Sequence, residues 1–444
     1  MDTPICDFVK KYTKSNFLRL HMPGHKGCGS LGAEQFDITE VDGADSLYEA
    51  DGIIKQSEQN ASRLFGCKTF YSTEGSSQCI RAMLYLAMLK AKQEGKAPPI
   101  FAARNAHKTF LSAAALLDLE VEWLYPETAD NYLCCDISAE GLEQALSDAV
   151  KKPTAVYITS PDYLGNVADV ASLAEVCHKY GALLLVDNAH GAYLKFLPKS
   201  QHPIDLGADL CCDSAHKTLP VLTGGAYLHL SEQMDKLLGN QAKNALALFG
   251  STSPSYLIMQ SLDAANAYLC DYPQKLSAFI AQVEKLKDEL TAYGFILRGG
   301  ESLKITVSAK DYGYTGKQIA DLLLRHGIVS EFSDPDYIVL MLTPETGEAG
   351  LEKLKRAMFS ISPKSPIKDS PPKLMKAERV MSIRDAALSA ADILPIDQCE
   401  GRILAAATVG CPPAVPVAIA GELLDEEAAK AFRYYGIEKI KTVI

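Results

Sequence analysis

The feature that most constrains the fold is an alternation of short apolar runs with helical patterns between residues 58 and 250. Helical patterns lie between several of the runs, as at 77–93 and 170–180. This alternation predicts an α/β fold with a mostly parallel sheet that helices cover on both faces. In such a sheet the loops at the carboxyl ends of the strands build the active site. The predicted strands are 68–72, 99–103, 121–125, 155–159, 182–187, 210–214 and 225–230.

The rest of the chain predicts a segment before this sheet and two smaller units after it. A long helix at 255–290, broken near Pro273, leads into an α+β unit. That unit has strands near 302–307 and 337–342 and a helix at 316–326. The predicted divisions are an irregular segment at 1–36, a large domain at 37–265, the α+β domain at 266–362, a proline-rich joint at 360–372, and a C-terminal domain at 373–444 that begins with a helix and ends with the proline-rich stretch 411–416.

Composition excludes several classes of protein. A net charge of −11 argues against a general role in binding nucleic acid. No run approaches the roughly 18 apolar residues of a membrane span, and residues 1–7 do not have the features of a secretory signal. The 12 cysteines are scattered, without C-x-x-C or a metal-ligand spacing. We therefore expect a cytoplasmic protein with reduced thiols, no metal site, no membrane contact and no nucleic-acid partner.

Two charged residues follow predicted strands. Lys217, in Asp213-Ser-Ala-His-Lys217-Thr, is placed to reach into a cleft, although a lysine at a strand end is more often a solvated surface residue. Schiff-base chemistry needs an amine of lowered basicity, which partial burial or a nearby cation provides. Asp187 ends the run 182–187, where it could pair with a protonated pyridine nitrogen or simply cap the next turn. Together the two residues predict a pyridoxal-type site more strongly than either does alone.

Two further motifs fit the same edge of the sheet. Ser72-Thr-Glu-Gly75-Ser76-Ser77 lies between a strand and a helix, so its backbone N–H groups and hydroxyls could bind a phosphate, although it could also be a plain helix cap. His107 follows the strand 99–103 and could stack on a cofactor ring, although a histidine in a loop is more often structural.

These four pieces, in this order, resemble the aminotransferase-like fold, fold type I, of pyridoxal-phosphate enzymes. Further motifs are similar to the ornithine/lysine/arginine decarboxylase family, and the resemblance covers most of the chain. The larger members carry an additional N-terminal assembly domain, so the chain resembles the short branch. The motifs are Leu20-His-Met-Pro-Gly-His-Lys-Gly27, Asp42-Gly-Ala-Asp-Ser-Leu47, Ser214-Ala-His-Lys217-Thr and Ser251-Thr-Ser-Pro-Ser-Tyr256.

The resemblance implies a role for each site residue. Lys217 would form the internal aldimine, and Lys217, His107 and His216 would be catalytic. Ser251 and Thr252 would reach the phosphate of a neighbouring subunit, which implies a homodimer with shared active sites. The residues implied to bind pyridoxal 5'-phosphate are Gly75, Ser76, Ser77, His107, Asp187, His190, Ser214, His216, Lys217, Ser251 and Thr252.

The implied reaction is decarboxylation of arginine, lysine or ornithine to carbon dioxide and a polyamine-type amine, through an external aldimine and a quinonoid. A buried cationic side chain is costly without an acceptor, so a carboxylate should lie at the end of the substrate pocket. Glu422 is the candidate by resemblance, and Asp45 is a weaker one. Other chemistry on the same cofactor, aminotransferase or β-lyase, stays open as the alternative, and a non-enzymatic relative is a second one.

Overall fold

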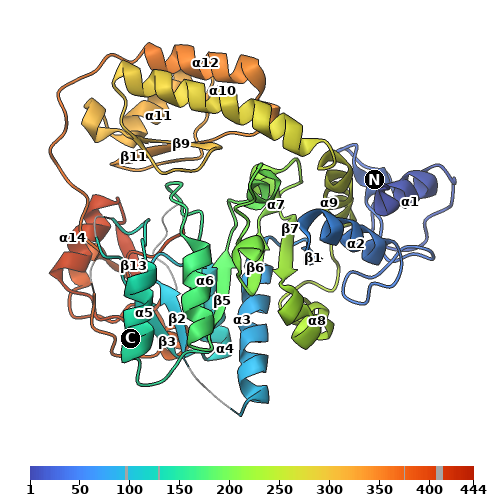
Figure 1. The fold of residues 1–444 in the computed structure, drawn as a ribbon, viewed down its shortest axis with the longest axis horizontal. Coiled ribbons are helices and arrows are strands. Elements are labelled where there is room, and N and C mark those ends of the chain that lie inside the picture. The colour runs from blue at the N-terminus through green and yellow to red at the C-terminus, as the bar shows by residue number, and fades with distance from the viewer. Residues whose placement is uncertain (96–98, 129–130, 375, 407–413) are drawn as a thin grey trace. The chain divides into compact units, whose positions relative to one another are not determined.

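The computed structural model describes residues 1–95, 99–128, 131–374, 376–406 and 414–444 (Figure 1). The chain forms two compact units. The first unit comprises residues 1–97 and 183–275, and the second comprises residues 98–182 and 276–444. The boundaries of these two units differ from the domain boundaries expected from the sequence. The expected domain boundaries stay a prediction.

The first unit is built on four strands in the order β1-β7-β6-β5. Strands β5 and β6 are parallel, and β7 runs antiparallel to both β6 and β1. All five residues of β5 and all five of β7 are buried, which explains why these strands are apolar apart from Asp187 and His229. The strands are β1 (Lys68–Ser72), β5 (Leu183–Asp187), β6 (Leu210–Asp213) and β7 (Ala226–Leu230), and the helices are α1 (Pro4–Thr13), α2 (Ile53–Phe65), α3 (Ser76–Gln93), α7 (Ala215–Thr218), α8 (Glu232–Ala247) and α9 (Tyr256–Tyr268).

The second unit contains the remaining parallel strands, with β2 paired to both β3 and β4. A separate antiparallel sheet has the order β10-β11-β9-β8, and β12 pairs with β13 near the C-terminus. The strands are β2 (Ile100–Ala103), β3 (Val121–Leu124), β4 (Ala155–Thr159), β8 (Leu297–Arg298), β9 (Lys304–Ser308), β10 (Phe332–Ser333), β11 (Tyr337–Met341), β12 (Ala391–Pro395) and β13 (Lys439–Val443). The helices are α4 (Lys108–Leu117), α5 (Ala139–Asp148), α6 (Val170–Lys179), α11 (Gly316–Arg325), α12 (Gly347–Phe359), α13 (Ile383–Leu388) and α14 (Glu426–Tyr434).

The predicted α/β class with mostly parallel strands is confirmed. The long helix expected at 255–290 is indeed broken before Pro273, because α9 ends at Tyr268 and α10 (Tyr272–Tyr293) begins a new helix. In the part of the chain that the structure describes, no helix is both long enough and apolar enough to cross a membrane.

The expectation of an irregular N-terminal segment was wrong for its first part, since residues 4–13 form helix α1. Ile5 and Val9, one turn apart, are fully buried. Pro4 lies in the first turn, where its missing N–H costs nothing, and the last turn carries Lys10 and Lys11. The apolar stripe of this helix is short, and the Gly, Pro and His residues that follow it dominate the pattern of the segment at 1–36.

The helix expected at the start of the C-terminal domain is absent from the described residues 373–374 and 376–382. Backbone pairing replaces it: Arg379 forms an antiparallel bridge with Glu422, and the Val380 N–H donates to Gly421 O at 2.9 Å. The first helix of this region is α13, capped by the Ser382 hydroxyl. Residues 411–413 of the predicted proline-rich stretch lie outside the described residues.

Candidate active site

The ends of two parallel strands bring the first site residues together. Asp187 is the last residue of β5 and lies opposite Cys212 of β6. The Asp187 carboxylate is buried and accepts hydrogen bonds from the Ala189 N–H at 3.2 Å and from the Cys212 thiol at 3.7 Å. A carboxylate at the carboxyl end of a buried strand is suited to pairing with a cationic group bound at that edge.

Lys217 extends from the short turn α7, which begins two residues after β6 ends. Its Nζ lies 3.0 Å from Nε2 of His190, a buried residue that follows Asp187 by three positions. An imidazole at this distance can take the proton of the amine, which must be neutral to act as a nucleophile. Lys217 and His190, which come from the segments after the neighbouring strands β6 and β5, therefore lie in contact.

The start of α3 forms a cradle suited to a phosphate. Gly75 precedes the helix with φ of 72°, a conformation that favours glycine, and its N–H donates to Gly224 O at 2.7 Å. Among the described residues no side chain caps this 18-residue helix, and a Cβ placed on Gly75 would meet no atom closer than Ser77 N at 3.9 Å. The Ser214 hydroxyl donates to Ser76 Oγ at 2.8 Å. The first turn of a helix, its dipole and clustered hydroxyls together suit a dianionic phosphate.

His216 lies in the same turn as Lys217 and is held by the loop next to this cradle. Its Nδ1 lies 3.0 Å from Gly225 O, and its backbone N–H donates to the same carbonyl at 3.2 Å. A carbonyl accepts only, so Nδ1 carries the proton, and Nε2 is an acceptor when the ring is neutral. Gly75, Ser76, Asp187, His190, Ser214, His216 and Lys217 thus all belong to connected loops of the first unit.

His107 belongs to the second unit and caps helix α4. Its Nδ1 accepts from the Thr109 N–H at 3.2 Å and contacts Thr109 Oγ1 at 3.0 Å. It follows strand β2, as expected, and the cap fixes the orientation of the ring. Its stacking on a cofactor stays a prediction.

Both candidate substrate carboxylates have partners within their own units. Glu422 is buried, accepts from the Ile419 N–H at 2.7 Å, and has an oxygen 3.7 Å from Arg104 Nη2. Burial raises the pKa of Glu422, against the opposing effect of the Arg104 charge. Asp45 is buried too, and accepts from the Gly52 and Ile54 N–H groups, each at 2.9 Å, at the start of α2. Neither side chain needs a substrate to be satisfied, and their substrate roles stay predictions.

Ser251 and Thr252 are exposed in the single chain. The Ser251 hydroxyl accepts from the Ser253 N–H at 3.1 Å, and the Ser251 N–H donates to the Glu74 carboxylate. Glu74 precedes Gly75, so this loop is anchored next to the phosphate cradle of its own chain. Contact with a neighbouring subunit stays a prediction.

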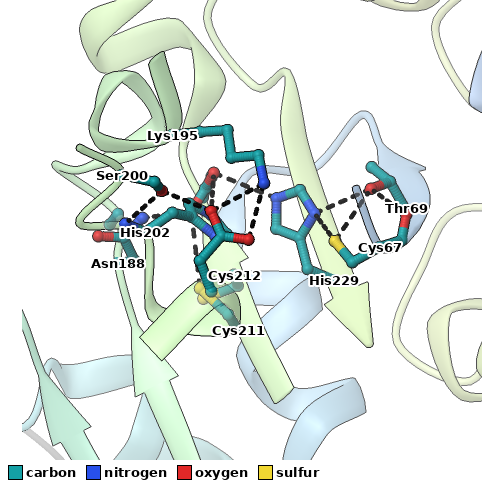
Figure 2. Close-up of polar contacts among 12 residues, drawn as sticks. Cys67, Thr69, Asn188, Lys195, Ser200, His202, Cys211, Cys212 and His229 are labelled. Atoms are coloured by element: carbon teal, nitrogen blue, oxygen red, sulfur yellow. Dashed lines mark hydrogen bonds and ion pairs between the residues drawn. The ribbon is translucent and has the colours of Figure 1, made fainter. Parts of the chain in front are cut away.

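Sequence reasoning missed a buried network behind this site. Asp213, the first residue of the lysine motif, contacts His202 and His229, and all three side chains are fully buried. Figure 2 labels both histidines. A histidine in the middle of the apolar strand β7 is the one signal that could have indicated such a network.

Comparison with known proteins identifies the family of this chain. The model of the Orn/Lys/Arg decarboxylase major domain matches residues 3–310, and that of the C-terminal domain of the same family matches residues 368–440. Arginine decarboxylase of Halalkalibacterium halodurans is 29% identical, over 96% of this chain and 91% of the relative. Arginine decarboxylase of Bacillus subtilis is 28% identical, over 96% and 92%.

Solved structures show the same fold. A lysine decarboxylase of Francisella novicida superposes with a TM-score of 0.78 at 17% identity, covering 100% of this chain and 81% of that one. Lysine decarboxylase A from Pseudomonas aeruginosa superposes with a TM-score of 0.79 at 15% identity, covering 99% and 80%. Since the first family model spans more than half of the residues, the chain belongs to the Orn/Lys/Arg decarboxylase family.

Proposed function

We propose that this protein is an arginine decarboxylase in which Lys217 binds pyridoxal phosphate covalently. Its family makes it a pyridoxal-phosphate-dependent decarboxylase. The observation that carries the site assignment is the 3.0 Å contact between Lys217 Nζ and His190 Nε2, in the loop that follows the buried Asp187.

Each residue then has a defined task. When bound, the cofactor ring supplies an electron sink for the electrons left behind as carbon dioxide departs. Asp187 keeps a proton on the pyridine nitrogen, because a buried carboxylate stabilises a cation beside it. His190 Nε2 takes the proton of Lys217 Nζ, which leaves a neutral amine able to form the covalent bond.

The phosphate is bound by the first turn of α3 and by nearby hydroxyls. Ser76, Ser77 and Ser214 supply the hydroxyls, and Gly75 leaves room for close approach. His216 lies beside this cradle through Gly225 O, and we assign it to the cofactor as well. His107 is assigned to the ring face, where a capped imidazole loses little further freedom on stacking.

The choice of arginine rests on the relatives. Those named arginine decarboxylase align over 96% of the chain, whereas the lysine decarboxylase structures, at 15–17% identity, support the fold alone. Glu422 is the proposed partner of the substrate cation. A guanidinium that approached Glu422 would have to share it with Arg104, which already lies 3.7 Å away.

Carbon dioxide release tests the function and the substrate together. Purified protein with added pyridoxal phosphate should release carbon dioxide fastest from arginine when arginine, lysine and ornithine are offered in parallel. Glu422→Gln should raise KM for the preferred substrate; a changed melting temperature with an unchanged KM would assign Glu422 to structure alone. Release from none of the three, by protein that binds the cofactor, would favour the aminotransferase or β-lyase alternative.

We also propose a cytoplasmic homodimer with shared active sites. Phe17, Leu18 and Leu20 are 68%, 81% and 83% exposed in the single chain, and exposed apolar groups of this kind mark interaction surfaces. Mixing inactive Lys217→Ala protein with inactive Ser251→Ala/Thr252→Ala protein should restore part of the activity if subunits exchange. A monomer in light scattering, or no activity in a mixture proved to contain hybrid dimers, would refute shared sites.

A further inference from the structure

Asp213, the last residue of β6, is a fully buried carboxylate surrounded by donors. Its Oδ2 lies 3.2 Å from Nε2 of His202 and 3.1 Å from Nε2 of His229. Its Oδ1 accepts from Asn188 Nδ2 at 2.7 Å and from the Cys211 thiol at 3.7 Å. Figure 2 labels His202, His229, Asn188 and Cys211 of this network and marks with dashed lines the polar contacts among the residues drawn. Such a carboxylate is costly to bury unless it is fully hydrogen-bonded, and these four donors meet that need.

The network is consistent with one anion and two donating imidazoles. Burial by itself would raise the pKa of Asp213, but its interactions with His202 and His229 outweigh burial and lower that pKa. Burial lowers the pKa of His229, so its ring donates through Nε2 while Nδ1 accepts from the Thr69 hydroxyl at 2.9 Å. His202 Nδ1 has no hydrogen-bond partner among the described residues, so His202 is held mainly through Asp213.

His202, Cys211 and Asp213 could also offer three ligand atoms to a metal ion. Burial raises the pKa of the Cys211 thiol, which keeps its proton for the hydrogen bond to Asp213 Oδ1 at 3.7 Å. The thiol is therefore a donor to the Asp213 carboxylate, and hydrogen bonding accounts for the group.

The position of Asp213 connects this network to the active site. Asn188 makes the shortest of the four hydrogen bonds to Asp213, at 2.7 Å. It lies between Asp187 and His190 in the loop after β5 and is fully buried. Ser214, the next residue after Asp213, donates to Ser76 of the phosphate cradle and leads into the turn that carries Lys217. The hydrogen bond between Asn188 and Asp213 thus joins the two strand ends that carry the site, together with the bond from the Asn188 N–H to Cys212 O at 3.0 Å.

We propose that Asp213, oriented by His202 and His229, is a positioning residue of the cofactor site. It fixes the spacing between Asp187 and His190 on one strand end and Ser214 and Lys217 on the other. This inference rests on the proposed function. Mutation of a residue that orients a binding or reactive group typically lowers affinity or activity by about 10–100-fold. The reason is that a displacement of about 1 Å takes the reactive group out of its productive position.

A pair of substitutions at His229 separates positioning from simple stability. His229→Gln retains an N–H donor that can reach Asp213, whereas His229→Leu removes it. We expect His229→Leu to bind pyridoxal phosphate about 10-fold more weakly and to shift the visible absorption of the bound cofactor, with His229→Gln within about threefold of the unmodified protein. His326→Leu, the same change at an exposed site of the second unit, should leave both properties unaltered.

The measurements are a cofactor titration by visible absorbance on folded protein and the melting temperature of each cofactor-free variant. Equal cofactor affinity and identical spectra in both His229 variants, with a lower melting temperature for His229→Leu alone, would overturn the inference and leave the proposed function intact. The inference would also be overturned if His229→Gln lost as much cofactor affinity as His229→Leu. The N–H donor to Asp213 would then make no difference to cofactor binding. An unmodified protein that binds no cofactor would refute the proposed function itself, and the inference with it.

Discussion

Replacing Lys217 by alanine is expected to remove both the visible absorbance of bound pyridoxal phosphate and the release of carbon dioxide. In the proposed site Lys217 supplies the amine that bonds to the cofactor, and His190, whose Nε2 lies 3.0 Å from its Nζ, takes the proton of that amine. No other described residue of the motif can replace a primary amine. Loss of a residue that forms a covalent bond during catalysis costs on the order of 10⁴-fold or more in turnover.

The control for this substitution is Lys236→Ala. Lys236 lies on α8 of the same unit, is exposed, and forms an i,i+4 ion pair with Glu232 that contributes little to stability. Lys236→Ala should retain the full absorbance and activity. Retention of the absorbance by folded Lys217→Ala protein would mean that another lysine binds the cofactor, and the assignment of the site would fall.

Replacing Asp187 by asparagine should nearly abolish turnover and weaken cofactor binding while leaving the fold in place. Asparagine has almost the same shape, but it lacks the charge that stabilises a protonated ring nitrogen. Breaking a buried charged pair costs about 3–5 kcal/mol, which corresponds to a loss on the order of 10²- to 10⁴-fold. Steady-state carbon dioxide release and a cofactor titration measure the two effects separately.

Asp187→Glu is the matched variant, because it keeps the charge and moves it by one methylene. We expect its activity to lie between those of the asparagine variant and the unmodified protein. Unchanged rates in Asp187→Asn would show that a different group pairs with the ring nitrogen. The hydrogen bonds of Asp187 with Ala189 and Cys212 would then have only a structural purpose.

The strands and the strand-end residues could be predicted from the sequence because both depend on local patterns. The apolar run at 68–72 matches β1 in full, and the run at 182–187 ends at Asp187, as β5 does. The positions of Lys217 and Ser76 could be predicted in the same way, because a residue just beyond a strand of a parallel sheet lies at the carboxyl edge of that sheet.

The network around Asp213 could not be predicted in this way, because its members meet only after folding. His229 reaches Asp213 through the antiparallel pairing of β6 with β7, and Thr69 comes from β1, 160 residues from His229. His202 lies in the segment between β5 and β6. The ion pair of Glu422 could not be predicted for a related reason, because its partner Arg104 comes from a segment more than 300 residues earlier.

The most direct test of the central assignment is to find the lysine that carries the cofactor. Purified protein saturated with pyridoxal phosphate would be reduced with borohydride, digested, and analysed by mass spectrometry. We predict a pyridoxyl group on Lys217, in the peptide that contains Ser214-Ala-His-Lys217. The same modification on another lysine, such as the buried Lys304 or Lys310 of the second unit, with Lys217 unmodified, would contradict the account.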